Sequence, residues 1–139
     1  MKKRAFVGFL IVVGLYKPVF ADENDFRCLT SVGLQKPVRL QFTFQTGKDD
    51  QEYVTYQRGS GRIKLQKIQE RELRKGPDGR PGTFEMSWKE ILPDGSGGRY
   101  VMVTQGARIY DFKYIRKDGK VLTFTEDSDA STEQGCVWK

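Results

Sequence analysis

The sequence predicts an all-β fold, a small antiparallel β-barrel or sandwich of seven or eight strands closed by one disulfide. Apolar and polar residues alternate with a period of two over most of the chain, as in strands with one buried face. Glycine-rich turn segments separate these stretches. The 139 residues are enough for one domain and include two cysteines, which lie on either side of the alternating region.

Residues 1–21 have the organisation of a secretory signal peptide. Positions 2–4 are basic, an uncharged and mostly apolar run occupies positions 5–16, and positions 19–21 read Val-Phe-Ala, which fits a signal peptidase site. The apolar run is about twelve residues long, whereas a bilayer span needs about twenty. We expect cleavage after Ala21, which leaves residues 22–139 as a single β domain. The mature protein would be periplasmic or secreted.

Cleavage would remove most of the positive charge. The whole chain has 24 Lys and Arg against 18 Asp and Glu, a formal charge of +6. Four of these bases precede residue 22, which leaves 20 bases against 18 acids and a net charge of +2. The basic balance is therefore largely a property of the targeting segment, and we expect no nucleic-acid partner.

The alternative to a cleaved signal peptide is an uncleaved N-terminal anchor. Lys17 and Pro18 interrupt the apolar run, which disfavours such an anchor.

Cys28 and Cys136 have one possible pairing, and an oxidising compartment favours it. The bridge would close a loop of about a hundred residues and contribute about 4–5 kcal/mol through loop entropy. No C-x-x-C pattern points to redox catalysis. We expect a structural disulfide between the two ends of the exported domain.

Seven alternating stretches are predicted strands. In the first, Val38, Leu40, Phe42 and Phe44 alternate with polar residues, so these four should face a core. The stretches are 38–45, 52–57, 62–65, 84–89, 99–104, 108–115 and 121–125, and the turns between them include 46–49, 58–61, 76–82, 93–98, 105–106 and an Asp-Gly hairpin turn at 117–120.

Two segments fit this pattern less well. Residues 64–75 are rich in helix formers, but the spacing of Leu65, Ile68 and Leu73 is a poor fit to a helix. We favour a long, bent edge strand over a short surface helix. Residues 126–135 are polar and acidic, and we expect a loop that returns Cys136 to the core.

The composition excludes most catalytic and metal sites. The chain has no histidine, and two cysteines cannot form a four-thiolate zinc site. The acid pair Glu70 and Glu72 lies among bases that would keep both carboxylates ionised. The segment from Asp127 opens like a calcium loop, but Thr132 and Trp138 replace its glycine and its bidentate acid. We expect no enzymatic activity, no cofactor and no metal.

A basic ribbon covers residues 58–80, which hold eight bases against three acids, a net charge of +5. It could contact anionic headgroups of a membrane surface or an acidic partner, or it could be a solvated edge that resists pairing with other sheets. The candidate contact residues are Arg62, Lys64, Lys67, Arg71, Arg74 and Lys75.

Five aromatic side chains are predicted to share one face. They either fill the interior of a barrel or line the ligand cavity of a lipocalin-like carrier, which would involve Trp88, Phe112 and Tyr114. The five residues are Phe84, Trp88, Tyr110, Phe112 and Tyr114.

The loop 93–98 carries three glycines and a serine, and recognition residues often lie on flexible loops of this kind. Here Ser96-Gly97-Gly98-Arg99-Tyr100 resembles the S-G-x-R-Y stretch of the periplasmic and membrane-bound inhibitors of C-type lysozyme. The aromatic strand 110–114, the turn 117–120 and Cys136 follow in the order found in that family, and residues 26–28 resemble its aromatic-x-Cys opening.

The resemblance implies an exported β-barrel whose loop serine and turn lysine enter a lysozyme cleft and hydrogen-bond its catalytic carboxyls. Its predicted partner-binding residues are Ser96, Gly97, Arg99, Tyr100 as a support of the loop, and Lys117. We therefore expect a non-enzymatic protein that binds a protein partner in the cell envelope, as an inhibitor of, or immunity protein against, a cell-wall-degrading enzyme. The alternatives are the lipocalin-like carrier and an envelope structural component that uses the basic ribbon.

The exported protein is expected to begin at Asp22 and to lack two thiol hydrogens, because signal peptidase would cut after Ala21 and the two cysteines would pair. Intact-mass measurement on material from the native host checks both points. Recovery of the uncleaved chain with both thiols free would contradict them.

Overall fold

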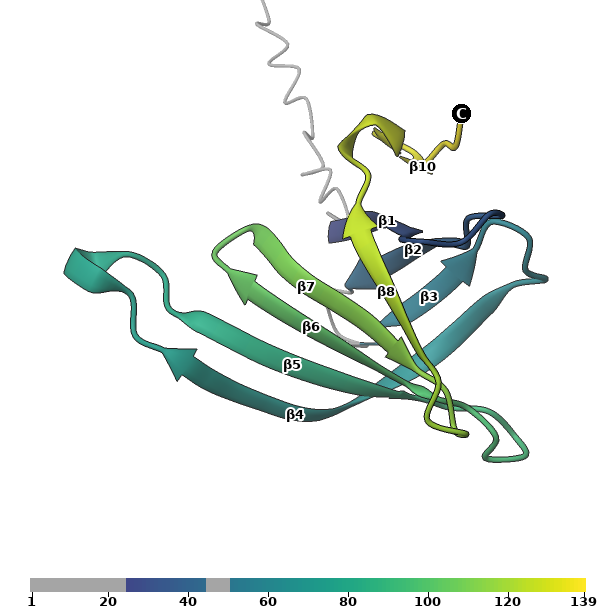
Figure 1. Ribbon diagram of the computed structural model, residues 1–139, viewed down its shortest axis with the longest axis horizontal. Helices are drawn as coiled ribbons and strands as arrows, with labels where there is room; N and C mark the ends of the chain where they lie inside the picture. Colours follow the sequence, from purple (N-terminus) through teal and green to yellow (C-terminus); the bar gives the residue numbers. More distant parts are fainter. Residues whose placement is uncertain (1–24, 45–50) are drawn as a thin grey trace, which may run out of the picture.

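The computed structural model describes residues 25–44 and 51–139; the predicted signal peptide (1–21) and the predicted turn 46–49 lie outside the described residues. Eight antiparallel strands form a closed barrel in sequence order (Figure 1), which confirms the all-β prediction and selects the barrel over the sandwich. The strands are β1 Asp25–Ser31, β2 Arg39–Phe44, β3 Tyr53–Tyr56, β4 Arg62–Arg74, β5 Thr83–Glu90, β6 Arg99–Gln105, β7 Arg108–Ile115 and β8 Val121–Glu126.

Strand β1 closes the barrel, and the sequence pattern did not reveal it. Leu29 pairs with Leu40 of β2 on one side and with Glu126 of β8 on the other. Cys28 and Leu29 are both buried, because Leu29 belongs to the barrel core while Cys28, on the opposite face, is bonded to the C-terminal segment. A strand covered on both faces lacks the alternation that marks the other strands.

Ten buried side chains fill the barrel, and five of them are aromatic. The ring centroid of Phe42 lies 4.8 Å from that of Trp88 and 5.9 Å from that of Phe112, both in edge-to-face geometry. Contacts of this kind add about 0.5–1.5 kcal/mol each beyond the burial of apolar area. The predicted inward positions of β2 are confirmed: Leu40 and Phe42 are fully buried, and Phe44 packs against the core.

The segment 64–75 is a strand, as predicted, and two bulges explain its irregular spacing. The pairing of β4 with β5 shifts register between Lys67 and Gln69 and again between Glu72 and Arg74. The inserted residues are Ile68 and Leu73, both of which are exposed. Their five-residue separation matches neither a helix nor a regular strand because each of them is an insertion.

Strands β4 to β7 continue beyond the closed part as a four-stranded sheet extension, formed by residues 66–74, 83–87, 101–105 and 108–111 (Figure 1, left). Strand β3 pairs with β4 only at residues 62–64, and β8 pairs with β7 only at residues 112–115. Among the described residues, both outer edges of the extension therefore lack a neighbouring strand. This makes β4 the edge strand that the sequence predicted.

One predicted aromatic position is wrong. The pairing of β6 with β7 shifts register at Tyr110, so that Ile109 packs against the core and Tyr110 is exposed. Tyr110 therefore does not share the inner face with Phe112 and Tyr114. Strict alternation cannot anticipate this, because a bulge reverses the facing of every residue beyond it.

The predicted disulfide is present. Cys28 and Cys136 are bonded, with their Cα atoms 5.7 Å apart and a sequence separation of 108. After β8 the chain forms a small hairpin of β9 (Ser131–Thr132) and β10 (Gly135–Cys136), which brings Cys136 back to the barrel. The Cys136 backbone N–H also donates a hydrogen bond to Gln41 Oε1 at 2.9 Å.

Replacing both cysteines by serine (Cys28→Ser with Cys136→Ser) is expected to lower the free energy of unfolding by about 4–5 kcal/mol, because the bridge removes loop entropy from the unfolded chain. Urea unfolding of the oxidised protein and of the double variant measures the difference. The reduced wild-type protein should unfold like the double variant. A loss under about 1 kcal/mol would mean that the bridge does not act as a constraint.

Candidate functional site

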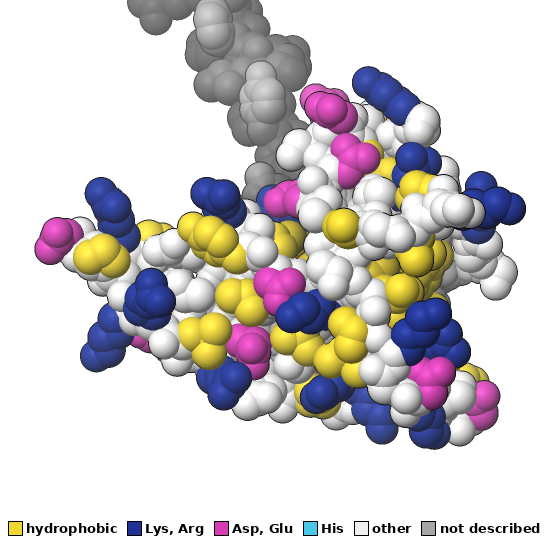
Figure 2. Space-filling model, in the orientation of Figure 1, with side chains coloured by type: hydrophobic (Ala, Val, Ile, Leu, Met, Phe, Trp, Pro, Cys, Tyr) yellow, Lys and Arg dark blue, Asp and Glu magenta, His cyan; other side chains and the backbone are white. Residues whose placement is uncertain are grey.

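Four connections meet at one end of the barrel because antiparallel strands place alternate connections at the same end. We call this the loop end; it consists of residues 32–38, 57–61, 91–98 and 116–120 (Figure 1, right). These connections carry five bases against two acids: Lys36, Arg58, Arg116, Lys117 and Lys120 against Asp94 and Asp118. Figure 2 shows basic side chains gathered at the lower right, where the β5–β6 loop and the β7–β8 turn lie, with acids among them.

The β5–β6 loop and the β7–β8 turn lie side by side. The Lys117 Nζ donates a hydrogen bond to the Gly95 carbonyl at 3.1 Å. The turn itself is closed by a bond from the Gly119 N–H to the Arg116 carbonyl at 2.9 Å, with Gly119 in the left-handed region at φ +89°. The two segments that the sequence singled out for partner binding are therefore brought together.

A cavity of about 330 Å³ opens beside this junction. Of the five predicted partner-binding residues, three line it, namely Gly97, Arg99 and Lys117. The others that line it are Ile68, Lys89, Gly98, Ile115, Arg116 and Gly119. No acidic side chain lines this cavity, and four bases do.

Two of those bases oppose each other across neighbouring strands. Lys89 of β5 is paired in register with Arg99 of β6 on the outer face. Like charges directly opposite each other destabilise a sheet. Neither base forms an ion pair within the described part of the chain, although Arg116 is bonded to Asp118 at 3.0 Å. The sequence analysis missed Lys89 and Arg116, which the register and the turn bring to the site.

Ser96 is engaged within its own loop. Its hydroxyl donates to Asp94 Oδ1 at 2.6 Å, and its backbone N–H donates to the same oxygen at 3.0 Å. These two bonds hold the pKa of the Asp94 carboxyl below its usual value, with the nearby Lys117 charge a smaller cause. Ser96 therefore shapes the loop, and its hydroxyl proton is already used.

Tyr100 lies behind the loop, inside the barrel. It is fully buried, and its hydroxyl donates to Glu90 Oε1 at 2.7 Å and also contacts the Tyr56 hydroxyl. Glu90 is buried as well, and a Cβ at Gly97 would lie 2.5 Å from the Glu90 Cβ, so only glycine fits there. The β5–β6 loop therefore packs directly on the buried Glu90 side chain, which is hydrogen-bonded to Tyr100 and through it to Tyr56.

Burial is the largest cause of the raised pKa values of these tyrosines. It raises the pKa of Tyr100 far above the usual value near 10, and the Tyr56 hydroxyl and the Glu90 carboxylate add to this. Burial also raises the pKa of Tyr56, although the bond to Tyr100 opposes the shift, and it raises the pKa of Tyr114. The sequence analysis considered Glu90 only as one of a carboxylate pair with Glu85 and missed its role beneath the loop, although it follows Trp88 at the inward-facing spacing of two.

The basic ribbon does not form one face. Lys67 opposes Trp88 of the core and is bonded to Glu70 at 2.7 Å, whereas Arg71 is bonded to Glu85 at 2.9 Å across β4 and β5. The Arg62 guanidinium lies 4.4 Å from the centre of the Tyr53 ring. Half of the six predicted contact residues thus have partners, and Lys64, Arg74 and Lys75 have no ion pair within the described residues. The ribbon remains a prediction with less charge available than its sequence implies.

The aromatic residues predicted for a carrier cavity are packed against other rings. Trp88 and Phe112 are fully buried, and the Tyr100 ring centroid lies 4.8 Å from that of Tyr114 and 5.9 Å from that of Phe112. These contacts are typical of a filled core. They lend no support to a lipocalin-like carrier.

Comparison of the chain with protein-family models, with curated proteins and with solved structures gave no match. Within residues 25–44 and 51–139, no three or more histidine, cysteine or acidic side chains are grouped as a metal site would require. No helix in that part of the chain has the length and apolar character needed to cross a membrane. The candidate site therefore rests on the geometry of the loop end.

The free energy of unfolding is expected to fall as the pH rises above about 10. Unfolded tyrosines ionise near pH 10, while burial keeps Tyr56 and Tyr100 protonated in the folded protein. The unfolded state then binds fewer protons than the folded state, so stability decreases with pH. Urea unfolding at about pH 9 and about pH 11 measures this difference.

Tyr56→Phe should reduce that loss, because it removes one of the tyrosines whose pKa burial raises. Tyr110→Phe is the matched control, since Tyr110 is exposed and its hydroxyl donates a hydrogen bond to Gln105 Oε1. Equal pH dependence in the two variants would contradict the explanation.

Proposed function

We propose that the protein is an exported binding protein whose β5–β6 loop and β7–β8 turn dock into the acidic cleft of a cell-wall-degrading enzyme such as a lysozyme and block it. The resemblance of residues 96–100 to lysozyme inhibitors suggests the kind of partner. The adjacency of Gly95 and Lys117 supports a common surface for loop and turn.

The opposition of Lys89 and Arg99 is the observation that carries this proposal. Two unpaired cations held face to face cost stability, and a protein retains such an arrangement more readily where a ligand compensates it. With Arg116 and Lys117 they line a hollow that lacks acids. An acidic cleft would relieve the repulsion and gain charge-assisted hydrogen bonds.

The expected contacts with the partner use the N–H donors of Lys117 and Arg99 that are not engaged within the described part of the barrel. Lys117 uses one of its three N–H donors on Gly95 and keeps two for a partner carboxylate. Arg99 is exposed and can bind a carboxylate with two parallel bonds. Ser96, which donates to Asp94, acts by holding the loop, and Tyr100 and Glu90 support it from below.

The purified protein is expected to inhibit a C-type lysozyme in a turbidity assay of cell-wall lysis at micromolar excess. Lys117→Ala and Arg99→Ala should each weaken inhibition about tenfold, since each removes a charge-assisted hydrogen bond to the partner. Inhibition should also weaken with added salt.

Lys75→Ala is the control, because Lys75 is exposed at the far end of β4 and outside the loop end. No inhibition by the wild-type protein, together with no muramidase or amidase recovered in a periplasmic pull-down, would reject the proposal. Equal losses for Lys75→Ala and Lys117→Ala would reject the assignment of the site.

A further inference from the structure

A second cavity at the loop end lies between the β1–β2 connection and the β3–β4 turn. Its volume is about 370 Å³. It is separate from the hollow beside Lys117, with which it shares no lining residue. Its lining includes Lys36, Pro37, Val38, Arg39, Tyr56 and Arg58.

The cavity is lined by three bases and by no acid. Lys36, Arg39 and Arg58 form no ion pair within the described part of the chain, whereas Arg27 and Lys113 elsewhere on the barrel each contact an acid. Unpaired cations around a concave surface raise the local concentration of anions. The site is therefore suited to a negatively charged group.

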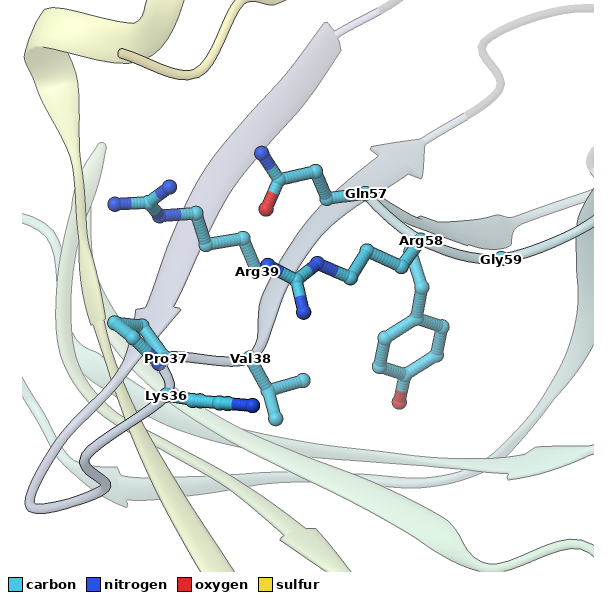
Figure 3. A pocket seen from close by; sticks show the side chains of 8 residues that line it. Lys36, Pro37, Val38, Arg39, Gln57, Arg58 and Gly59 are labelled. Atoms are coloured by element: carbon cyan, nitrogen blue, oxygen red, sulfur yellow. The ribbon is translucent and has the colours of Figure 1, made fainter.

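The directions of the basic side chains indicate where in the cavity an anion would bind. Figure 3 shows Lys36 and Arg58 reaching toward the middle of the cavity from different sides, with Val38 between them. Arg39 points the other way, toward the C-terminal segment, and its guanidinium lies 6.0 Å from the centre of the Trp138 ring. Its buried Nε has no hydrogen-bond partner among residues 25–44 and 51–139. Lys36 and Arg58 are the contacts for an anion, and Arg39 adds positive potential.

The remaining surface is apolar. Val38 and Tyr56 pack against the barrel core and form the floor, and Pro37 lies beside them. On the same connection, outside the cavity lining, Val32 and Leu34 are 54% and 41% exposed. An inorganic anion would leave this apolar surface in water, whereas a ligand with an apolar body would cover it.

We propose that this cavity binds an anionic amphiphile, with a carboxylate or phosphate headgroup between Lys36 and Arg58 and an apolar body against Pro37, Val38 and Tyr56. This site is independent of the docking surface around Lys117, so either proposal can fail without the other. The headgroup chemistry is the same for a free amphiphile and for a lipid in a membrane, and the experiment separates these sources.

The test titrates the purified, oxidised protein with three probes: octyl phosphate below its micelle concentration, inorganic phosphate, and phosphatidylglycerol vesicles with phosphatidylcholine vesicles as the uncharged reference. Chemical shifts of the Val38 and Tyr56 amides report binding of the soluble probes, and co-sedimentation reports binding to vesicles. The site variant is Lys36→Gln with Arg58→Gln. Its matched control, Arg108→Gln with Lys113→Gln, loses the same charge on β7, outside both the cavity and the basic ribbon.

Saturable binding of octyl phosphate is expected, tighter than that of inorganic phosphate, and weakened about tenfold in the site variant but not in the control variant. Binding to phosphatidylglycerol vesicles alone, with the same dependence on the variants, would assign the headgroup to a membrane. The proposal is overturned by no binding of octyl phosphate or vesicles, by equal losses in both variants, or by inorganic phosphate binding as tightly as octyl phosphate.

Discussion

The structure depends on the position of β1 between β2 and β8. Leu29 of this strand completes the aromatic core, and Cys28 beside it carries the bond to the C-terminal segment. One strand thus closes the barrel and fixes the chain end. The antiparallel pairing of β6 with β5 and with β7 places the loop at Gly95 within a hydrogen bond of the turn at Lys117.

Both proposed sites follow from the antiparallel order of the strands. Alternate connections meet at the loop end, and this end carries an excess of basic side chains. Beneath the β5–β6 loop, Glu90 and Tyr100 form a buried polar contact that fixes the loop from inside. A rigid barrel with a seated loop loses little conformational entropy on binding, which favours recognition by shape and charge. The basic ribbon on β4 is less suited to this, because Lys67 and Arg71 already have acidic neighbours.

The sequence was sufficient to predict the barrel class, the edge strand and the disulfide, since alternation along residues 38–44 and a single cysteine pair follow local rules. It was insufficient for β1, whose two buried faces hide its period, and for Tyr110, whose facing depends on a bulge. At the candidate site, loop 93–98 and Lys117 were recognisable from composition and resemblance. The roles of Lys89 and Glu90 were not recognisable. Lys89 matters because it is paired with Arg99 across two strands, and Glu90 matters because Gly97 of the loop packs against it.

The open edge of the sheet extension has a consequence for self-association. Glu70 and Glu72 share the inner face of β4 with the core side of β5, and Arg71 lies on the outer face opposite Glu85. If two copies joined antiparallel along this edge with their faces matched, alignment centred on residue 70 or 72 would set glutamate against glutamate, and alignment centred on residue 71 would set arginine against arginine. The alternating charges therefore disfavour these three alignments along the open edge.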